Sequence, residues 1–186
     1  MLLVHAGNRP DVPGRADERF PAQYVAPVRA CVHRLIEVLA PAGVVSAASA
    51  GADLIVLEAA LDLGIPVHVV VPVERTEFVA RSVSDAGAVW VRRFDHVARA
   101  AADAPNSLFE AHAVASDGWE RRANAVIIER TRHLAGTDGR VLALTVRPLP
   151  EEDPPSVTDD LASRATALGW PVLTLDPREP GAVRVG

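Results

Sequence analysis

Three short apolar segments of the chain are each followed by residues that could bind a ligand. The first leads into His-Ala-Gly-Asn-Arg at residues 5–9, the second into a run of small residues at 46–53, and the third stops at Pro72. Apolar runs that end in such turns are typical of β-strands. In open α/β sheets, ligands bind beyond the carboxyl ends of the strands, near the point where the strand order reverses. The sequence therefore places its candidate ligand-binding residues at three strand ends.

The run at residues 46–53 is the most informative of the three. It reads Ser-Ala-Ala-Ser-Ala-Gly-Ala-Asp and leads into a predicted helix, so a ligand can approach its backbone closely. The N–H groups at a helix start carry partial positive charge and favour phosphate, and Ser46 and Ser49 add hydroxyl donors. A ligand-free alternative stays open, because the run is neither a P-loop nor a strict G-x-G-x-x-G. In that alternative Ser49 caps the helix, Gly51 allows tight packing and Asp53 complements the helix dipole.

Two charged residues are candidates for roles at the same site. Glu58 follows Gly51 by seven residues and lies on roughly the same helix face, among apolar neighbours. It is a candidate catalytic carboxylate, and an ordinary half-exposed helix glutamate is the alternative. Arg9 could offer a planar guanidinium to a phosphate. Its alternative is a pairing with Asp11 or Asp17 in the same loop.

Composition and charge exclude several classes of protein. The formal net charge is −5 and basic residues are not interleaved with aromatic ones, so we expect no nucleic-acid partner. The histidines show no metal-binding spacing, so no metal site is expected. The single cysteine, Cys31, cannot form an intramolecular disulfide, which suits a reducing compartment. No apolar run is long enough to span a membrane and no signal peptide is recognisable, so we expect no membrane partner and a cytoplasmic location.

Strand and helix patterns alternate along the whole chain. Strands are predicted at residues 1–4, 43–46, 67–71, 107–114, 141–146 and 172–175, and helices at 28–39, 52–64, 90–102, 117–134 and 158–168, with a short helical turn near Phe78. Such alternation implies βαβ crossovers and a parallel sheet. We therefore expect an α/β, Rossmann-like three-layer fold, with a mainly parallel sheet flanked by helices. No internal repeat or second domain is evident, so residues 1–186 are expected to form one domain.

Several motifs occur in an order that resembles the SLOG superfamily, which joins the DNA-processing Smf/DprA proteins with the Lonely Guy nucleotide hydrolases. They are, in chain order, Gly7-Asn8-Arg9, Pro13-Gly14-Arg15, Arg19-Phe20-Pro21, the run 46–54, Glu58-Ala59-Ala60-Leu61, the segment 69–72, Glu77-Phe78, Ser82-Val83, Trp90 and Arg93-Phe94-Asp95. The resemblance covers about the first hundred residues, and the remainder only as the order of strands and helices. It looks closest to a bacterial branch with a GHR-like first turn and a G-A-D helix start, often found in conflict or signalling proteins.

The resemblance implies a sheet whose first two strand ends cradle a nucleotide or a nucleotide-derived ligand. The residues it brings to that site, together with those argued above, are Gly7, Asn8, Arg9, Ser46, Ala47, Ser49, Gly51, Ala52, Asp53, Pro72, Phe78, Arg81 and Ser82. No further cofactor is required. Members of the superfamily commonly pair through helices that flank the site, so the resemblance also suggests a homodimer.

This sequence departs from the hydrolase branch of the superfamily in ways that bear on catalysis. It has Ala-Ser-Asp-Gly at residues 115–118 in place of a P-G-G-x-G-T turn, although Glu120 and Asn124 follow. Asn8 replaces the usual histidine of the first turn, and Ser46 replaces a glycine of the phosphate loop. The resemblance therefore supports binding better than catalysis.

Three hypotheses remain open from the sequence. The leading one is a protein that binds or senses a nucleotide-type ligand, in bacterial signalling or defence. The second is a nucleotide N-glycosidase or phosphoribohydrolase, with Glu58 or Glu120 as its catalytic carboxylate. The third is a ligandless interaction domain.

Overall fold

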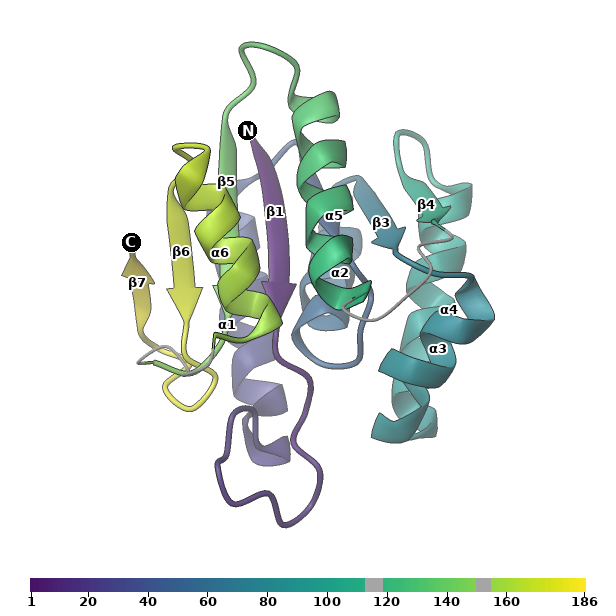
Figure 1. Cartoon of the computed structure of the whole chain (residues 1–186), viewed down its shortest axis with the longest axis vertical. Helices are drawn as coiled ribbons and strands as arrows, with labels where there is room; N and C mark the ends of the chain where they lie inside the picture. The colour runs from purple at the N-terminus through teal and green to yellow at the C-terminus, as the bar shows by residue number, and fades with distance from the viewer. Residues whose placement is uncertain (113–118, 150–154) are drawn as a thin grey trace.

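Seven strands form one sheet in the order β4-β3-β2-β1-β5-β6-β7. The computed structural model describes residues 1–112, 119–149 and 155–186 (Figure 1). The strands are β1 (Leu2–Gly7), β2 (Gly43–Ser46), β3 (Val67–Val71), β4 (Leu108–Ala111), β5 (Val141–Val146), β6 (Val172–Leu175) and β7 (Val183–Val185). All neighbouring strands are parallel except β6 and β7, which are antiparallel. The predicted, mainly parallel sheet is confirmed.

Helices cover both faces of this sheet. They are α1 (Val25–Leu39), α2 (Ala52–Asp62), α3 (Arg75–Ser82), α4 (Ala88–Asp103), α5 (Trp119–Ala135) and α6 (Val157–Ala167), with short 3-10 turns η1 (Ala22–Tyr24) and η2 (Ser84–Ala86). In Figure 1, α5 and α6 lie in front of the sheet, and α1 and α2 lie behind it. This arrangement confirms the predicted Rossmann-like three-layer α/β fold. Among the residues that the structure describes, no helix has the length and apolar character needed to cross a membrane.

Two apolar clusters join the helices to the sheet. On β1, Leu3 packs with residues of α1 and α2 on one face, whereas Val4 packs with residues of α5 and α6 on the other. Both side chains are fully buried, and burial of such a side chain contributes about 1.5–3 kcal/mol. β5 is buried along its whole length, as an apolar strand covered by helices on both faces should be.

The strand order reverses between β1 and β5. The chain first places β2, β3 and β4 on one side of β1, and α5 then carries it across the sheet to β5 on the other side. In doubly wound sheets the loops on either side of such a reversal diverge and leave a crevice beyond the carboxyl ends of the strands. That end of β1 and β5 lies at the bottom of the sheet in Figure 1.

The structure differs from the sequence-based prediction in three elements. Residues 75–82 form a complete helix, α3, in place of a short turn near Phe78. β1 extends beyond Val4 to Gly7, because Ala6 and Gly7 pair with β5. The exposed strand β7 was not predicted, since its three residues are too short for a periodic pattern. Of the predicted strand 107–114, the segment 108–111 is confirmed, while 113 and 114 lie outside the described residues.

Candidate functional site

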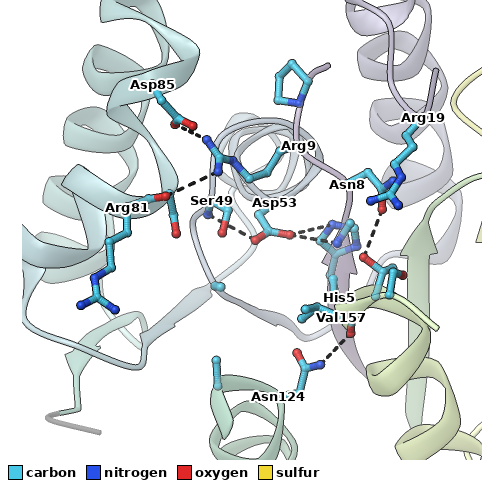
Figure 2. Close-up of a pocket in the computed structure, with 18 of the residues that line it drawn as sticks. His5, Asn8, Arg9, Arg19, Ser49, Asp53, Arg81, Asp85, Asn124 and Val157 are labelled. Carbon is cyan, nitrogen blue, oxygen red and sulfur yellow. Dashed lines mark hydrogen bonds and ion pairs between the residues drawn. The ribbon is translucent and has the colours of Figure 1, made fainter. Parts of the chain in front are cut away.

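A pocket of about 380 Å³ opens beyond the carboxyl ends of β1 and β2. It is bounded by α3 and η2 on one side and by α5 and α6 on the other (Figure 2). Nine of the predicted binding residues line it: Gly7, Asn8, Arg9, Ala47, Ser49, Asp53, Phe78, Arg81 and Ser82. The structure thus brings the first two strand ends and the segment beyond the third into one pocket.

The other predicted binding residues are not among those that line the pocket. Ser46 is fully buried and its hydroxyl donates to the carbonyl of His5 at 3.2 Å. Gly51 has φ +103°, and a Cβ there would lie 2.6 Å from the carbonyl oxygen of Asn8. Ala52 packs so closely on β1 that a Cβ on Gly7 would clash with it at 2.4 Å. These residues therefore fasten α2 against the end of β1.

Pro72 lies directly after β3 and is buried, also away from the pocket lining. It is a cyclic residue that cannot donate a backbone hydrogen bond, so it suits the end of a strand. Pro72 therefore ends strand β3 and is not one of the residues that line the pocket.

Asp53 ties the end of β1 to the turn before α2. Its Oδ1 accepts from the N–H of Gly7 at 3.1 Å, and its Oδ2 accepts from the N–H of Ser49 at 3.2 Å. In the same turn, the N–H groups of Ala50 and Ala52 donate to the carbonyls of Ser82 and Asn8. The expectation that these N–H groups are free for a phosphate is therefore wrong for Ser49, Ala50 and Ala52, which have protein partners.

His5 lies beside Asp53 and was not among the sequence-predicted site residues. It is fully buried in β1, and its Nδ1 lies 2.8 Å from the carbonyl oxygen of Leu144. A carbonyl only accepts, so Nδ1 carries the hydrogen and Nε2 presents a lone pair toward Asp53 Oδ1, 3.5 Å away. His5 Nε2 is buried and has no hydrogen-bond partner among the residues that the structure describes.

Burial shifts the pKa of both side chains toward their uncharged forms. Burial raises the pKa of Asp53 to about 7, although hydrogen bonds from Ser49 and Gly7 oppose the shift. Burial also lowers the pKa of His5 to about 4, although the hydrogen bond with the Leu144 carbonyl opposes the shift. Near pH 5–6 both side chains are therefore uncharged, with Asp53 protonated and His5 neutral. The sequence signal for His5 was a histidine directly after the predicted strand 1–4, but only the fold shows that it lies beside Asp53.

The α3 side of the pocket and the loop after β1 carry its positive charge. The arginines that line the pocket are Arg9, Arg15, Arg19 and Arg81. Arg9 pairs with Asp85 and also donates to the carbonyl of Arg81 at 3.4 Å. The predicted alternative, a pairing of Arg9 with Asp11 or Asp17, is therefore wrong.

These arginine pairs are exposed enough for an anionic ligand to compete with them. The Arg9 side chain is 37% exposed, and its partner Asp85 is 55% exposed. Arg81 is 49% exposed and pairs with Glu77 at 2.7 Å. Exposed pairs of this kind contribute at most about 1 kcal/mol, so a phosphate can recruit the same guanidinium groups at little cost.

The opposite wall of the pocket, on α5 and α6, is uncharged in the part that the structure describes. It consists of Ala123, Asn124, Ile127, Ser156, Val157 and Thr158. Thr158 donates to Asn8 Oδ1 at 3.3 Å, which joins this wall to the end of β1. The pocket therefore has a cationic side, on which four arginines outnumber Asp11, Asp53 and Asp85, and a neutral side that faces it.

Of the two candidate catalytic carboxylates, the structure describes the side chain of Glu58. Glu58 accepts two hydrogen bonds from Arg93, at 2.7 and 2.5 Å, and the Arg93 guanidinium lies 4.1 Å from the centroid of the Trp90 ring. Glu58 is not a lining residue of the pocket. Glu120 lies in the first turn of α5, and its side chain is outside the described residues. Within the described parts of the chain, no group of three His, Cys, Asp or Glu residues is arranged to hold a metal ion.

Because Glu58 has a structural partner, we expect Glu58→Gln to lower the free energy of unfolding by about 1–3 kcal/mol, since one charge-assisted hydrogen bond of the bidentate pair is lost. Urea unfolding measures this change. Affinity for a ligand of the pocket should stay within twofold of the wild-type value, because Glu58 does not line the pocket. A large loss of affinity without loss of stability would return Glu58 to the list of site residues.

Comparisons with models of known protein families and with curated proteins find no match to this chain. The resemblance to the SLOG superfamily therefore stays a prediction from the motifs. The function of the protein is therefore inferred from the geometry of the pocket.

Proposed function

We propose that this protein binds or senses a nucleotide or nucleotide-derived small molecule in the pocket at the end of β1. The observation that carries the proposal is the division of the pocket into a cationic side and an uncharged side. A nucleotide has the same division, between its phosphates and its base. The volume of about 380 Å³ lies within the range of small-molecule sites.

In this proposal the phosphates lie toward the arginines and the base lies toward α5 and α6. Arg9 is the best placed of the cations, because it extends from the end of β1 between Asp53 and Asp85 (Figure 2). The N–H groups of Ser49 and Ala50 already have protein partners, so arginine side chains supply the positive charge instead. Ser49 and Ser82, which also line the pocket, add hydroxyl groups between the two sides.

A matched pair of variants tests the role of Arg9. Arg9→Ala should weaken binding of a nucleoside monophosphate about tenfold, because a charge-assisted hydrogen bond to phosphate is lost. Asp85→Asn should strengthen the same binding, because Arg9 loses its competing carboxylate. Isothermal titration calorimetry with AMP measures both, and adenosine, which lacks the phosphate, is the control. Changes of the same sign in the two variants would contradict this role for Arg9.

A thermal-shift screen tests the proposal as a whole. The probes are nucleoside mono-, di- and triphosphates, NAD, ADP-ribose and inorganic phosphate. A compound that binds only the folded state raises the melting temperature with its concentration. We expect a shift with at least one nucleotide and a smaller shift with its nucleoside. No shift with any compound at millimolar concentration would favour the ligandless interaction domain.

One observation favours a second function, the hydrolysis of an N-glycosidic bond. Asp53 lines the pocket, and its pKa of about 7 leaves it partly protonated near neutral pH, as a general acid for a leaving base should be. Chromatography of AMP or NAD incubated with the protein tests this function. Free base that is produced by the wild type and absent with Asp53→Asn would support hydrolysis. If the nucleotide stays intact, the result supports binding without hydrolysis.

A further inference from the structure

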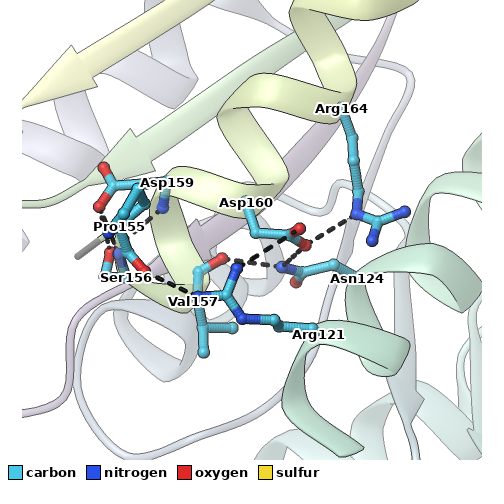
Figure 3. A network of polar contacts seen from close by, with 8 residues as sticks. All are labelled: Arg121, Asn124, Pro155, Ser156, Val157, Asp159, Asp160 and Arg164. Atoms are coloured by element: carbon cyan, nitrogen blue, oxygen red, sulfur yellow. Dashed lines mark hydrogen bonds and ion pairs between the residues drawn. The ribbon is translucent and has the colours of Figure 1, made fainter. Parts of the chain in front are cut away.

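Asn124 of α5 lines the pocket from its uncharged wall and is held by α6 (Figures 2 and 3). It is 3% exposed. Its Nδ2 donates to the carbonyl of Val157 at 2.8 Å and to Asp160 Oδ2 at 2.9 Å. Both hydrogens of the amide nitrogen are thus used by the first turn of α6.

The chemistry of these two partners fixes the orientation of the Asn124 amide. A carbonyl and a carboxylate only accept hydrogen bonds, so the amide nitrogen must face them. If the amide were rotated by 180°, its oxygen would lie against two acceptors. The nitrogen therefore remains toward α6, and Oδ1 is turned away from it.

Asp160 is itself held in place by arginines from two helices. Arg164 Nε donates to Asp160 Oδ2 at 2.7 Å, and Arg121 NH1 lies 3.8 Å from Oδ1 (Figure 3). Arg121 also donates to the carbonyl of Pro155 at 2.8 Å, just before α6 begins. This network connects the first turns of α5 and α6, so the acceptor that orients Asn124 cannot easily rotate.

As a consequence, Asn124 Oδ1 is a hydrogen-bond acceptor with a fixed orientation on the neutral side of the pocket. Figure 2 shows the Asn124 side chain on the wall opposite Arg9, with its oxygen on the side away from the Val157 carbonyl. An amide that can rotate accepts or donates according to the ligand. Asn124 can only accept, because its donors are already used.

We propose that Asn124 is a specificity-determining residue that selects ligands with an amino group on the base. The proposal rests on the nucleotide-binding function proposed above. A base that bears an amino group at this point donates to Asn124 Oδ1. A base without it leaves a nearly buried acceptor unpaired, which costs affinity. The ligand group that Asn124 recognises is therefore an N–H donor at the uncharged end of a phosphorylated ligand.

The test compares nucleotides that differ only in an amino group. AMP is paired with purine riboside 5′-monophosphate, which lacks the 6-amino group, and GMP is paired with IMP, which lacks the 2-amino group. For wild-type protein, calorimetry should show that the amino-bearing member of at least one pair binds about tenfold tighter, which corresponds to about 1.4 kcal/mol. In Asn124→Ala this ratio should fall to about 1, mostly through weaker binding of the amino-bearing member.

Two more variants keep the test decisive. Asp160→Ala removes one of the two acceptors that orient Asn124, so the ratio should shrink even if Asn124→Ala does not fold. Glu129→Gln, on the exposed face of α5 and outside the pocket lining, is the control and should keep the wild-type ratio. If no nucleotide binds the wild type, the proposed function itself fails. If nucleotides bind but neither pair is discriminated, or the preference survives in Asn124→Ala and Asp160→Ala, this inference is overturned and the proposed function stands.

Discussion

Replacement of Asp159 by alanine is expected to lower the free energy of unfolding by about 3–5 kcal/mol. Asp159 Oδ1 lies 2.9 Å from Arg147 NH1, and the two side chains are only 3% and 7% exposed. The variant leaves the positive charge of Arg147 buried without this carboxylate. It also removes the capping box of α6, in which Asp159 accepts from the N–H of Ser156 at 2.7 Å. Urea unfolding, followed by circular dichroism, measures the loss.

An exposed ion pair provides the control for this effect. Arg75 and Asp95 lie 2.8 Å apart, and each side chain is 45% exposed. Asp95→Ala should therefore cost less than about 1 kcal/mol. If the two variants lose equal amounts of unfolding free energy, burial does not make the ion pair of Asp159 more important than that of Asp95. Because the first turn of α6 lines the pocket, Asp159→Ala should also weaken nucleotide binding in conditions where the variant remains folded.

The second large effect is expected when the buried pair of His5 and Asp53 is broken. In the wild type, the folded pair binds one proton between about pH 4 and pH 7, on Asp53. The unfolded pair also binds one proton between pH 3.8 and 6.5, on His5, as the ordinary pKa values of the two groups imply. Folding therefore changes the number of bound protons little across this range, and the pair gives almost no dependence of stability on pH.

Asp53→Asn should remove this balance and make the protein sensitive to acid. Burial lowers the pKa of His5, and Asp53 is not the cause of that shift, so we expect the pKa of His5 to stay low in the variant. The folded state then binds no proton between about pH 6.5 and 4, whereas the unfolded state does. Stability should fall as the pH falls through this window, by about 3 kcal/mol in total.

Unfolding measured in urea at several pH values between 4 and 7 tests this expectation. The matched control is Asp62→Asn, which changes a carboxylate that is 51% exposed on α2. The curve of the control should run parallel to that of the wild type. If the Asp53→Asn curve is also parallel to it, protonation of Asp53 does not compensate for the low pKa of His5.

The sequence was sufficient for most of the fold, because apolar runs bounded by turn residues mark buried strands directly. Residues 43–46, 67–71, 141–146 and 172–175 are strands with the bounds predicted for them. Helix α3 was predicted only as a short helical turn near Phe78, because residues 75–82 are mostly polar and Phe78 is their large buried residue. Strand β7 was missed because a strand of three exposed residues has no pattern to detect.

The site was accessible from the sequence on one side only. The residues after β1 and β2 can be recognised as candidate site residues from the sequence, because they are small or polar and follow predicted strands. The opposite wall, with Asn124 and Thr158, comes more than a hundred residues later in the chain than Asn8. It faces Asn8 only because β5 lies next to β1. The order of strands in a sheet cannot be predicted from the pattern of any single segment. The same limit applies to Glu58, whose partner Arg93 comes from a different helix.

Hydrogen exchange read by mass spectrometry, with and without the nucleotide that gives the largest thermal shift, tests the central claim most directly. We predict slower exchange at both sides of the pocket: in residues 5–12 at the end of β1, and in the first turns of α5 and α6 around Asn124 and Val157. The far end of the sheet, near Gly43, should not change. Protection confined to one wall, or to a surface away from these segments, would contradict a nucleotide that spans the pocket from its arginines to its neutral side.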